Sequence, residues 1–247
     1  MSIQSKHCYS MSLGPVTTKD KILDTAELLF SDLGFDNTSL RSITSKADVN
    51  LASVNYHFGS KKELIQAVME RYLSVLMPAI DEKLTQLTSG EKQVKLTTLF
   101  EAMVEPILKL DSVRPNGART FMQLFAKAYY ESQGHMKRFV NERYGAVLKR
   151  FNAVLVTTVP HLPLREIFWR WHFALGSCVF TMGSSKALTD MAEADYKQRM
   201  AVAELIRGVI HFIAAGFAAP SVEDDATNRQ PAEDMARSTL CPERDIA

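Results

Sequence analysis

The spacing of apolar side chains is the feature that most constrains the fold of this chain. Between Thr17 and Ala219, apolar residues recur at steps of three and four, which is the period of one helical face. Strands would alternate every second residue between hairpin turns, and that alternation does not occur. We therefore predict an all-α protein, and 46% apolar residues in a chain of 247 supply a sizeable buried core.

The cysteines, histidines and motif content exclude several kinds of site. Cys8, Cys178 and Cys241 lie far apart and form no Cys-x-x-Cys pair, so we expect neither a disulfide framework nor a cysteine-based zinc site. The six histidines show no short metal-ligand spacing. The sequence has no HExxH, GxSxG or Walker motif, and no GxGxxG after a strand. We predict a protein that is not an enzyme and uses no metal or cofactor.

Two segments of the sequence bear on the cellular location of the protein. The first 17 residues contain no apolar run of the length found in signal peptides. The longest apolar stretch, Ile167–Met182, is interrupted by Arg170 and His172, so we expect no transmembrane span and no membrane contact. The sparse cysteines also fit a reducing compartment. We predict a cytoplasmic protein.

Charge alone gives no decisive sign of nucleic-acid binding. Residues 1–75 have a net charge of 0, residues 76–220 of +5, and residues 221–247 of −4. No segment has the strong positive charge that would indicate nucleic-acid binding by itself. The polar, acidic composition of 221–247 predicts a disordered tail, and residues 1–16 are expected to be a flexible N-terminus.

Capping residues divide the segment from Thr17 to Leu76 into three short helices and one long one. Thr17 and Asp20 suit the start of the first helix, and Gly34 suits its left-handed end. The four helices are expected to begin close to Thr18, Leu40, Leu51 and Lys61. Pro78 is expected to interrupt or kink the fourth helix. We predict a three-helix DNA-binding unit over 17–76 and a helical effector-binding and dimerisation domain over 77–220.

The segment Ser39–Leu64 has the pattern of a helix-turn-helix. Its first helix has early apolar residues and the small Ala47 near its end, and Asp48 occupies the turn. Val54 and Phe58 face inward on the next helix, which leaves a small, polar outer face that could enter a major groove. The residues expected to contact DNA are Thr38, Ser39, Arg41, Asn50, Ala52, Ser53, Asn55, Tyr56, His57 and Lys61. Similar three-helix units occur in proteins that never bind DNA, so the pattern alone leaves both interpretations open.

The stretch Thr18–Val68 resembles the DNA-binding domain of the TetR family of bacterial transcriptional regulators. The matching residues are Gly34, Phe35, Thr38, Ser39, Leu40, Ile43, Ala47, Val49, Tyr56, His57, Phe58, Lys61 and Leu64. Asp48 departs from the glycine usual in that turn, although aspartate tolerates a left-handed conformation better than most residues. The resemblance implies that Leu51–His57 is the recognition helix, with Tyr56 and Lys61 at phosphates. It also implies a homodimer on palindromic operator double-stranded DNA.

The last two predicted helices, Pro163–Ser185 and about Tyr196–Phe217, suit the dimer interface that the resemblance implies. Their apolar and small residues would allow a four-helix contact with two-fold symmetry, and a break is expected over Ser184–Asp195. The residues expected in the interface are Glu166, Arg170, Ser177, Thr181, Ser184, Leu205, Val209, Phe212 and Ile213. The alternative is that both helices are simply buried within a monomer.

A group of methionine, aromatic and basic residues is the candidate ligand site. Methionine and aromatic side chains suit an adaptable apolar cavity, and Arg143 and Arg150 lie seven residues apart at the edge of an apolar helical face. That basic rim would suit an amphiphile with a carboxylate or phosphate head. The expected ligand residues are Met103, Phe121, Leu124, Phe125, Tyr129, Arg143, Val147, Arg150 and Phe173. The alternative is ordinary core packing beneath a solvated charged face.

Beyond the first domain, the segments SQGHMKRFVNERYG and FWRWHFALG are similar to the PsrA-type fatty-acid-responsive repressors. With the helix-turn-helix segment, this likeness covers about two thirds of the chain. It implies repression of fatty-acid degradation genes, relieved by a long-chain fatty acid or its acyl-CoA. The alternative is a ligand-independent architectural DNA-binding protein of the same fold.

Overall fold

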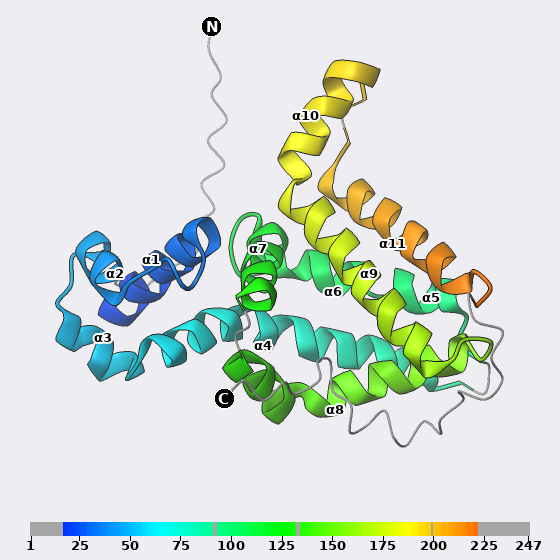
Figure 1. Ribbon diagram of the computed structural model, residues 1–247, viewed down its shortest axis with the longest axis horizontal. Coiled ribbons are helices and arrows are strands. Elements are labelled where there is room, and N and C mark those ends of the chain that lie inside the picture. Colours follow the sequence, from blue (N-terminus) through cyan, green and yellow to red (C-terminus); the bar gives the residue numbers. More distant parts are fainter. Residues whose placement is uncertain (1–16, 91–92, 132–133, 199, 222–247) are drawn as a thin grey trace, which may run out of the picture.

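The computed structural model describes residues 17–90, 93–131, 134–198 and 200–221. The predicted flexible N-terminus and all of the predicted acidic tail except Ser221 lie outside these residues. Within them the chain is helical and contains no strand, which confirms the all-α prediction (Figure 1). The elements are α1 (Thr18–Leu33), α2 (Leu40–Ala47), α3 (Leu51–Phe58), α4 (Lys61–Thr88), α5 (Leu96–Glu101), α6 (Val104–Lys109), the 3-10 helix η1 (Leu110–Ser112), α7 (Gly117–Tyr130), α8 (Gly134–Thr158), α9 (Leu164–Gly183), α10 (Ser185–Tyr196) and α11 (Val202–Ala218).

Helices α1 to α3 and the start of α4 form a small unit at one end of the molecule, which we call the head (Figure 1). Thr17 and Asp20 form a reciprocal capping box at the start of α1, and Gly34 ends it with a φ of +90°. Ile22, Phe30 and other apolar residues of the four helices close the core of the head. Leu33, at the end of α1, is 49% exposed and lies outside this core.

Helix α4 runs without a break from the head into the rest of the molecule, which we call the body (Figure 1). The predicted interruption at Pro78 does not occur. Proline removes one helical hydrogen bond, but buried residues on both sides of it, Leu76, Met77 and Ala79, hold the helix in the core. The expected boundary between 76 and 77 therefore falls inside a continuous helix.

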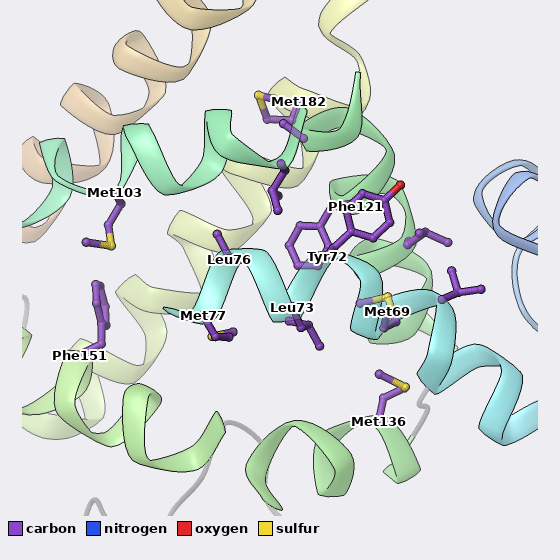
Figure 2. Close-up of a cluster of buried hydrophobic side chains, with 14 of the residues drawn as sticks. Met69, Tyr72, Leu73, Leu76, Met77, Met103, Phe121, Met136, Phe151 and Met182 are labelled. Carbon is purple, nitrogen blue, oxygen red and sulfur yellow. The ribbon is translucent and has the colours of Figure 1, made fainter. Parts of the chain in front are cut away.

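The body packs α5 to α9 and α11 around the second half of α4. Helix α8 lies along α4, α7 lies between the head and α9, and α9 and α11 lie side by side (Figure 1). The buried core around α4 is rich in sulfur and aromatic rings, as Figure 2 shows. The labelled members of this cluster include Met69, Tyr72, Met77, Met103, Phe121, Met136, Phe151 and Met182.

The segment between α9 and α11 is a helix, and the predicted break over Ser184–Asp195 was wrong. Its serine and aspartate residues suggested a loop, yet it contains no proline or glycine after Ser184 and has several good helix formers. Lys186 and Asp190 also form an i,i+4 ion pair of 2.6 Å. Helix α10 projects away from the body (Figure 1). The last helix consequently begins at Val202 rather than at Tyr196.

Candidate functional site

Local hydrogen bonds fix the geometry of the α2–α3 pair. Ser39 caps α2 by accepting a hydrogen bond from the backbone N–H of Ser42 at 3.0 Å. Asp48 ends α2 with a φ of +53°, so aspartate does adopt the left-handed conformation that the turn needs. The Asn50 side chain accepts from the N–H of Ala52 at 2.5 Å and so caps α3. Val54 is fully buried and holds α3 against the head.

The outer face of α3 is exposed and polar. Tyr56 is 86% exposed, and its ring contacts His57 edge-on at 5.1 Å between centroids. Six of the predicted DNA-contacting residues are exposed: Ser39, Arg41, Asn50, Ala52, Asn55 and Tyr56. Ser53, His57 and Lys61 are half-buried. Leu51, at the first position of α3, is 42% exposed and was missing from the predicted set, although its place at the start of the expected recognition helix could have signalled it.

Thr38 departs from the predicted set because its side chain is fully buried. Its hydroxyl donates to the backbone carbonyls of Gly34 at 2.7 Å and of Leu29 at 3.2 Å. A threonine at this position therefore ties the end of α1 to the start of α2. The structure gives it a packing role, and the expected DNA contact at Thr38 was wrong.

The predicted apolar ligand residues fall into the body core rather than around an open space. Met103, Phe121 and Leu124 are each at most 8% exposed. Phe125 and Val147 are partly buried against the same core. The rings of Tyr72, Phe121, Phe125 and Tyr129 form a continuous row, with centroids about 6 Å apart. Tyr129 is 42% exposed, so the row runs from the core to the surface.

The two arginines of the predicted basic rim are paired with carboxylates of α4. Arg143 lies 3.1 Å from Glu70, which also accepts a hydrogen bond from the Tyr144 hydroxyl at 3.0 Å. Arg150 lies 2.8 Å from Asp81. These contacts join α8 to α4. Burial, followed by the bond to Glu70, raises the pKa of Tyr144.

Phe173 does not lie with the other predicted ligand residues. It is 66% exposed on the outer side of α9, where its ring stacks on Trp169 at 6.3 Å between centroids. The pattern of α9 alone could not tell a pocket-facing aromatic from an outward one. Phe180 and Phe212 are also more than 60% exposed on α9 and α11. These four aromatics make an outer apolar surface that we call the α9–α11 face.

A groove of about 550 Å³ lies along the α9–α11 face, lined by Trp169, Phe173, Ser177, Phe212 and Ile213 among others. Of the predicted dimer residues, Phe212 is exposed there, whereas Ile213 is 5% exposed and packs within the protomer. The remaining small or apolar members of that set are half-buried: Ser177, Thr181, Ser184, Leu205 and Val209. Trp169 and Phe180 are exposed aromatics that the prediction missed.

Arg170 and Glu166, also expected in the dimer interface, are occupied within the protomer. The Arg170 guanidinium donates to the carbonyls of Gly216 at 2.6 Å and Ala219 at 2.8 Å, and it forms an ion pair with Glu166. Their side chains are only 10% and 15% exposed. The pair therefore caps the C-terminal end of α11, where basic groups satisfy free carbonyls.

A second cavity, of about 520 Å³, lies between α5, α6 and α11 and is lined by Glu105, Arg207 and His211 among others. Apart from Phe173, none of the predicted ligand residues lines either cavity.

In the part of the chain that the structure describes, no cluster of histidine, cysteine or acidic residues could hold a metal ion. No helix within the same ranges is long and apolar enough to cross a membrane.

Two family models match the chain. Residues 22–68 match the tetR family of bacterial regulatory proteins, and residues 101–216 match the tetracyclin repressor-like C-terminal domain. The first match contains α2 and α3, and the second contains most of the body. Together they cover more than half of the sequence.

Curated relatives align with part of the chain. The regulator YttP of Bacillus subtilis, described as a probable HTH-type transcriptional regulator, is 32% identical over 34% of this chain and 41% of its own length. The HTH-type transcriptional repressor KstR2 of Mycolicibacterium smegmatis is 32% identical over 38% of this chain and 44% of its own. The chain thus spans less than half the length of these relatives.

Solved structures of the same fold extend over most of the chain. A TetR-like transcriptional regulator from Rhodococcus sp. RHA1 covers 84% of this chain and 99% of its own, with 17% identity and a TM-score of 0.53. AmtR of Mycobacterium smegmatis covers 86% and 99%, with 16% identity and a TM-score of 0.51. The matched family consists of regulators and not of enzymes. The helix-turn-helix geometry, the two family matches and the shared fold agree, and the chain belongs to the TetR family of bacterial regulatory proteins.

Proposed function

We propose that the protein is a transcriptional repressor that binds palindromic operator double-stranded DNA as a homodimer in the cytoplasm. The observation that carries this proposal is the outer face of α3, where Tyr56 is 86% exposed on a helix anchored by buried Val54. Small and polar residues around Tyr56 let the helix enter a major groove, while its amides and hydroxyls reach base edges and phosphates.

The exposed aromatics of the α9–α11 face are the evidence on which we base the proposed homodimer. Four large aromatics lie exposed on two adjacent helices, and monomeric proteins rarely leave so much contiguous apolar surface in water. Pairing this face with its two-fold copy would bury the groove and set two α3 helices on one side of the assembly. Half-sites one DNA turn apart, about 34–36 Å, would fit such a pair.

The DNA proposal is tested with an operator selected from random duplexes and a mobility-shift titration at fixed salt. Tyr56→Ala is expected to weaken operator binding by about tenfold or more, the loss of one good contact. Tyr196→Ala is the matched control, because Tyr196 is 75% exposed on α10, which is not part of the head. Equal operator affinity for the two variants would contradict the role given to Tyr56.

We infer that the effector is a long-chain fatty acid or its acyl-CoA, in keeping with the PsrA-type resemblance. We also infer that the protein controls fatty-acid degradation genes. The methionine-rich core around α4 can repack around an apolar chain, because thioether side chains are flexible and polarisable (Figure 2). The aromatic row ending at Tyr129 gives such a chain a route to the surface. Arg143, with 55% of its side chain exposed, could exchange Glu70 for an anionic head group.

The effector proposal is tested by release of the bound operator across octanoyl-, palmitoyl- and oleoyl-CoA, the matching free acids, and coenzyme A without an acyl chain. Release that grows with chain length supports the proposal. Arg143→Gln is expected to weaken release, while Lys149→Gln, an exposed lysine on the same helix, is expected to leave it unchanged.

A ligand-independent architectural DNA-binding protein is the second candidate, because neither described cavity opens among the predicted core ligand residues. Operator that stays bound with every acyl compound would favour this candidate.

A further inference from the structure

Two of the polar contacts between head and body lie at the two ends of α7. Arg114, three residues before the helix, forms an ion pair with Glu27 of α1. Glu131, directly after the helix, accepts a hydrogen bond from the backbone N–H of Asp36 at 2.7 Å, in the turn between α1 and α2. One body helix is therefore bonded to the head at both of its ends.

Glu27 is the unusual member of this arrangement, because its carboxylate is fully buried. Its Oε2 accepts a hydrogen bond from the guanidinium of Arg71 on α4 at 3.1 Å, and its Oε1 forms the ion pair with Arg114. Arg71 also lies 2.6 Å from Asp24 of α1. A buried carboxylate needs compensation by opposite charge, and Glu27 obtains it from both α4 and the segment before α7. Its position thus depends on α4 and on the segment before α7 at once.

The segment that carries Arg114 is held rigidly to α7. Asp111 accepts a hydrogen bond from the N–H of Ala118 at 3.1 Å, and Asn116 has a φ of +60°. Gly117 packs so closely on the Leu110 carbonyl that a Cβ would overlap it. Because these contacts tie the turn to the start of α7, we expect a movement of α7 to move Arg114 as well.

The other end of α7 fits a notch that follows α1. Gly34 has a φ of +90°, and a Cβ there would overlap the Glu131 carboxylate. The same carboxylate receives the Asp36 N–H, so Glu131 occupies space that only glycine leaves open. The hydrogen bond therefore links the end of α7 to the turn that follows α1.

Between these two contacts, α7 faces the body core. Ala118, Phe121 and Leu124 are buried, and the Phe121 ring lies 5.7 Å from that of Tyr72 on α4. Helix α7 also packs on α9. A rearrangement of this core that moves α7 therefore displaces a helix whose two ends are bonded to the head.

We propose that α7 transmits rearrangements of the body core to the head through two positioning contacts, Arg114 with the buried Glu27 and Glu131 with the Asp36 N–H. This inference rests on the proposed ligand-responsive binding of operator. A ligand that favours a displaced α7 would pull α1 at both contacts and change the angle at which α3 meets DNA. Operator and ligand would then oppose each other through one shared helix.

The test removes the two contacts and leaves the rest of the core intact. Arg114→Met and Glu131→Ala are made singly and together in the full chain. Arg71 remains on Glu27 in both, so the buried carboxylate keeps one partner. Lys83→Met is the matched control, since it removes an ion pair of 2.5 Å with Glu105 that lies wholly within the body. If the double variant loses its helical circular dichroism, Arg114→Gln with Glu131→Gln replaces it.

The first readout needs neither DNA nor ligand. Spin labels are placed at Lys46 on α2 and Lys149 on α8, both exposed, after the three cysteines are replaced by alanine. We expect a narrow distance distribution in the parent chain and the control, and a broader one in the double variant. A distribution that stays as narrow in the double variant overturns the proposal, whatever the protein is found to bind.

The second readout is the factor by which palmitoyl-CoA weakens operator binding. Allosteric factors are commonly about 5–150-fold. In the double variant we expect this factor to fall toward one, while the separate affinities for operator and for palmitoyl-CoA are retained. A factor equal to that of the parent chain would overturn the proposal. A parent chain that ignores palmitoyl-CoA would refute the proposed effector, and the distance measurement would still decide the role of α7.

Discussion

Tyr144 of α8 donates its hydroxyl hydrogen to Glu70 of α4 over 3.0 Å, at the level where α4 passes from the head into the body. Arg143 lies 3.1 Å from the same carboxylate oxygen, so one acidic residue of α4 holds two consecutive residues of α8. Glu70 is 25% exposed, and hydrogen bonds to a partly buried charged group are stronger than those on the surface.

Tyr144→Phe is expected to lower the free energy of unfolding by about 1.5–3 kcal/mol, the contribution of a hydrogen bond to a charged partner. The phenyl ring keeps the packing, so the loss reports the hydroxyl. Urea unfolding followed by circular dichroism measures it. Tyr196→Phe, at an exposed tyrosine of α10, is the control and should change the unfolding free energy little. A loss no larger than that of the control would show that the contact contributes nothing.

Tyr72→Phe should act in the opposite direction. The Tyr72 side chain is fully buried and its hydroxyl forms no well-aligned hydrogen bond, so removing the oxygen ends a desolvation cost. We expect the unfolding free energy to rise by up to about 1 kcal/mol. A clear fall would mean that the hydroxyl has a partner in solution, for which Thr120 is a candidate.

Alkaline pH should destabilise the protein through both tyrosines. Burial raises the pKa of Tyr72 above its ordinary value of 10.0, and burial with the Glu70 bond raises that of Tyr144. The unfolded chain then loses these protons first. Ionisation of these tyrosines therefore leaves the unfolding free energy unchanged below about pH 10 and lowers it as pH rises above that value. Unfolding free energies measured from pH 8 to 11 should fall less steeply in Tyr72→Phe than in the parent chain.

How much the sequence could predict depends on whether a feature is local. The N-cap at Thr17 and the left-handed Asp48 follow from neighbours in the chain, and both were predicted correctly. Phe173 could not be placed, because the helical period shows that a side chain lies on one face but not which neighbour that face meets. Arg150 was expected to face a ligand, yet its guanidinium is paired with Asp81, 69 residues earlier in the sequence.

The contrast between Gly117 and Gly145 gives a stability test of the turn that holds Arg114. A Cβ at Gly117 would overlap the Leu110 carbonyl, whereas Gly145 of α8 has no atom within 4 Å of such a Cβ. Gly117→Ala is expected to cost about 1–3 kcal/mol, as overpacking does. Gly145→Ala is expected to add about 0.5–1 kcal/mol, because alanine is the better helix former. Thermal unfolding of the two variants measures both changes in stability. A Gly117→Ala variant as stable as the parent chain would contradict the tight turn.

Thr38→Val separates a packing role from a DNA-binding one. Valine keeps the shape of the side chain but removes the hydroxyl that donates to Gly34 and Leu29. Two buried carbonyls then lose a donor, so we expect about 1–3 kcal/mol of lost stability. Operator affinity, measured at a temperature where the variant is fully folded, should equal that of the parent chain. A folded variant with weakened affinity would restore Thr38 to the DNA contacts.

Phe212→Arg tests the α9–α11 face. Phe212 is 69% exposed beside the groove that Trp169 and Phe173 also line, so an arginine there costs the protomer little. In a two-fold dimer the same substitution occurs twice in one interface, which removes apolar contact and places unpaired charges against an apolar surface. We expect sedimentation velocity to show a dimer for the parent chain and a monomer for the variant at the same concentration. Arg207→Ala, on the same helix but beside the second cavity, is the control that should remain dimeric. A Phe212→Arg chain that sediments as a dimer would place the interface elsewhere.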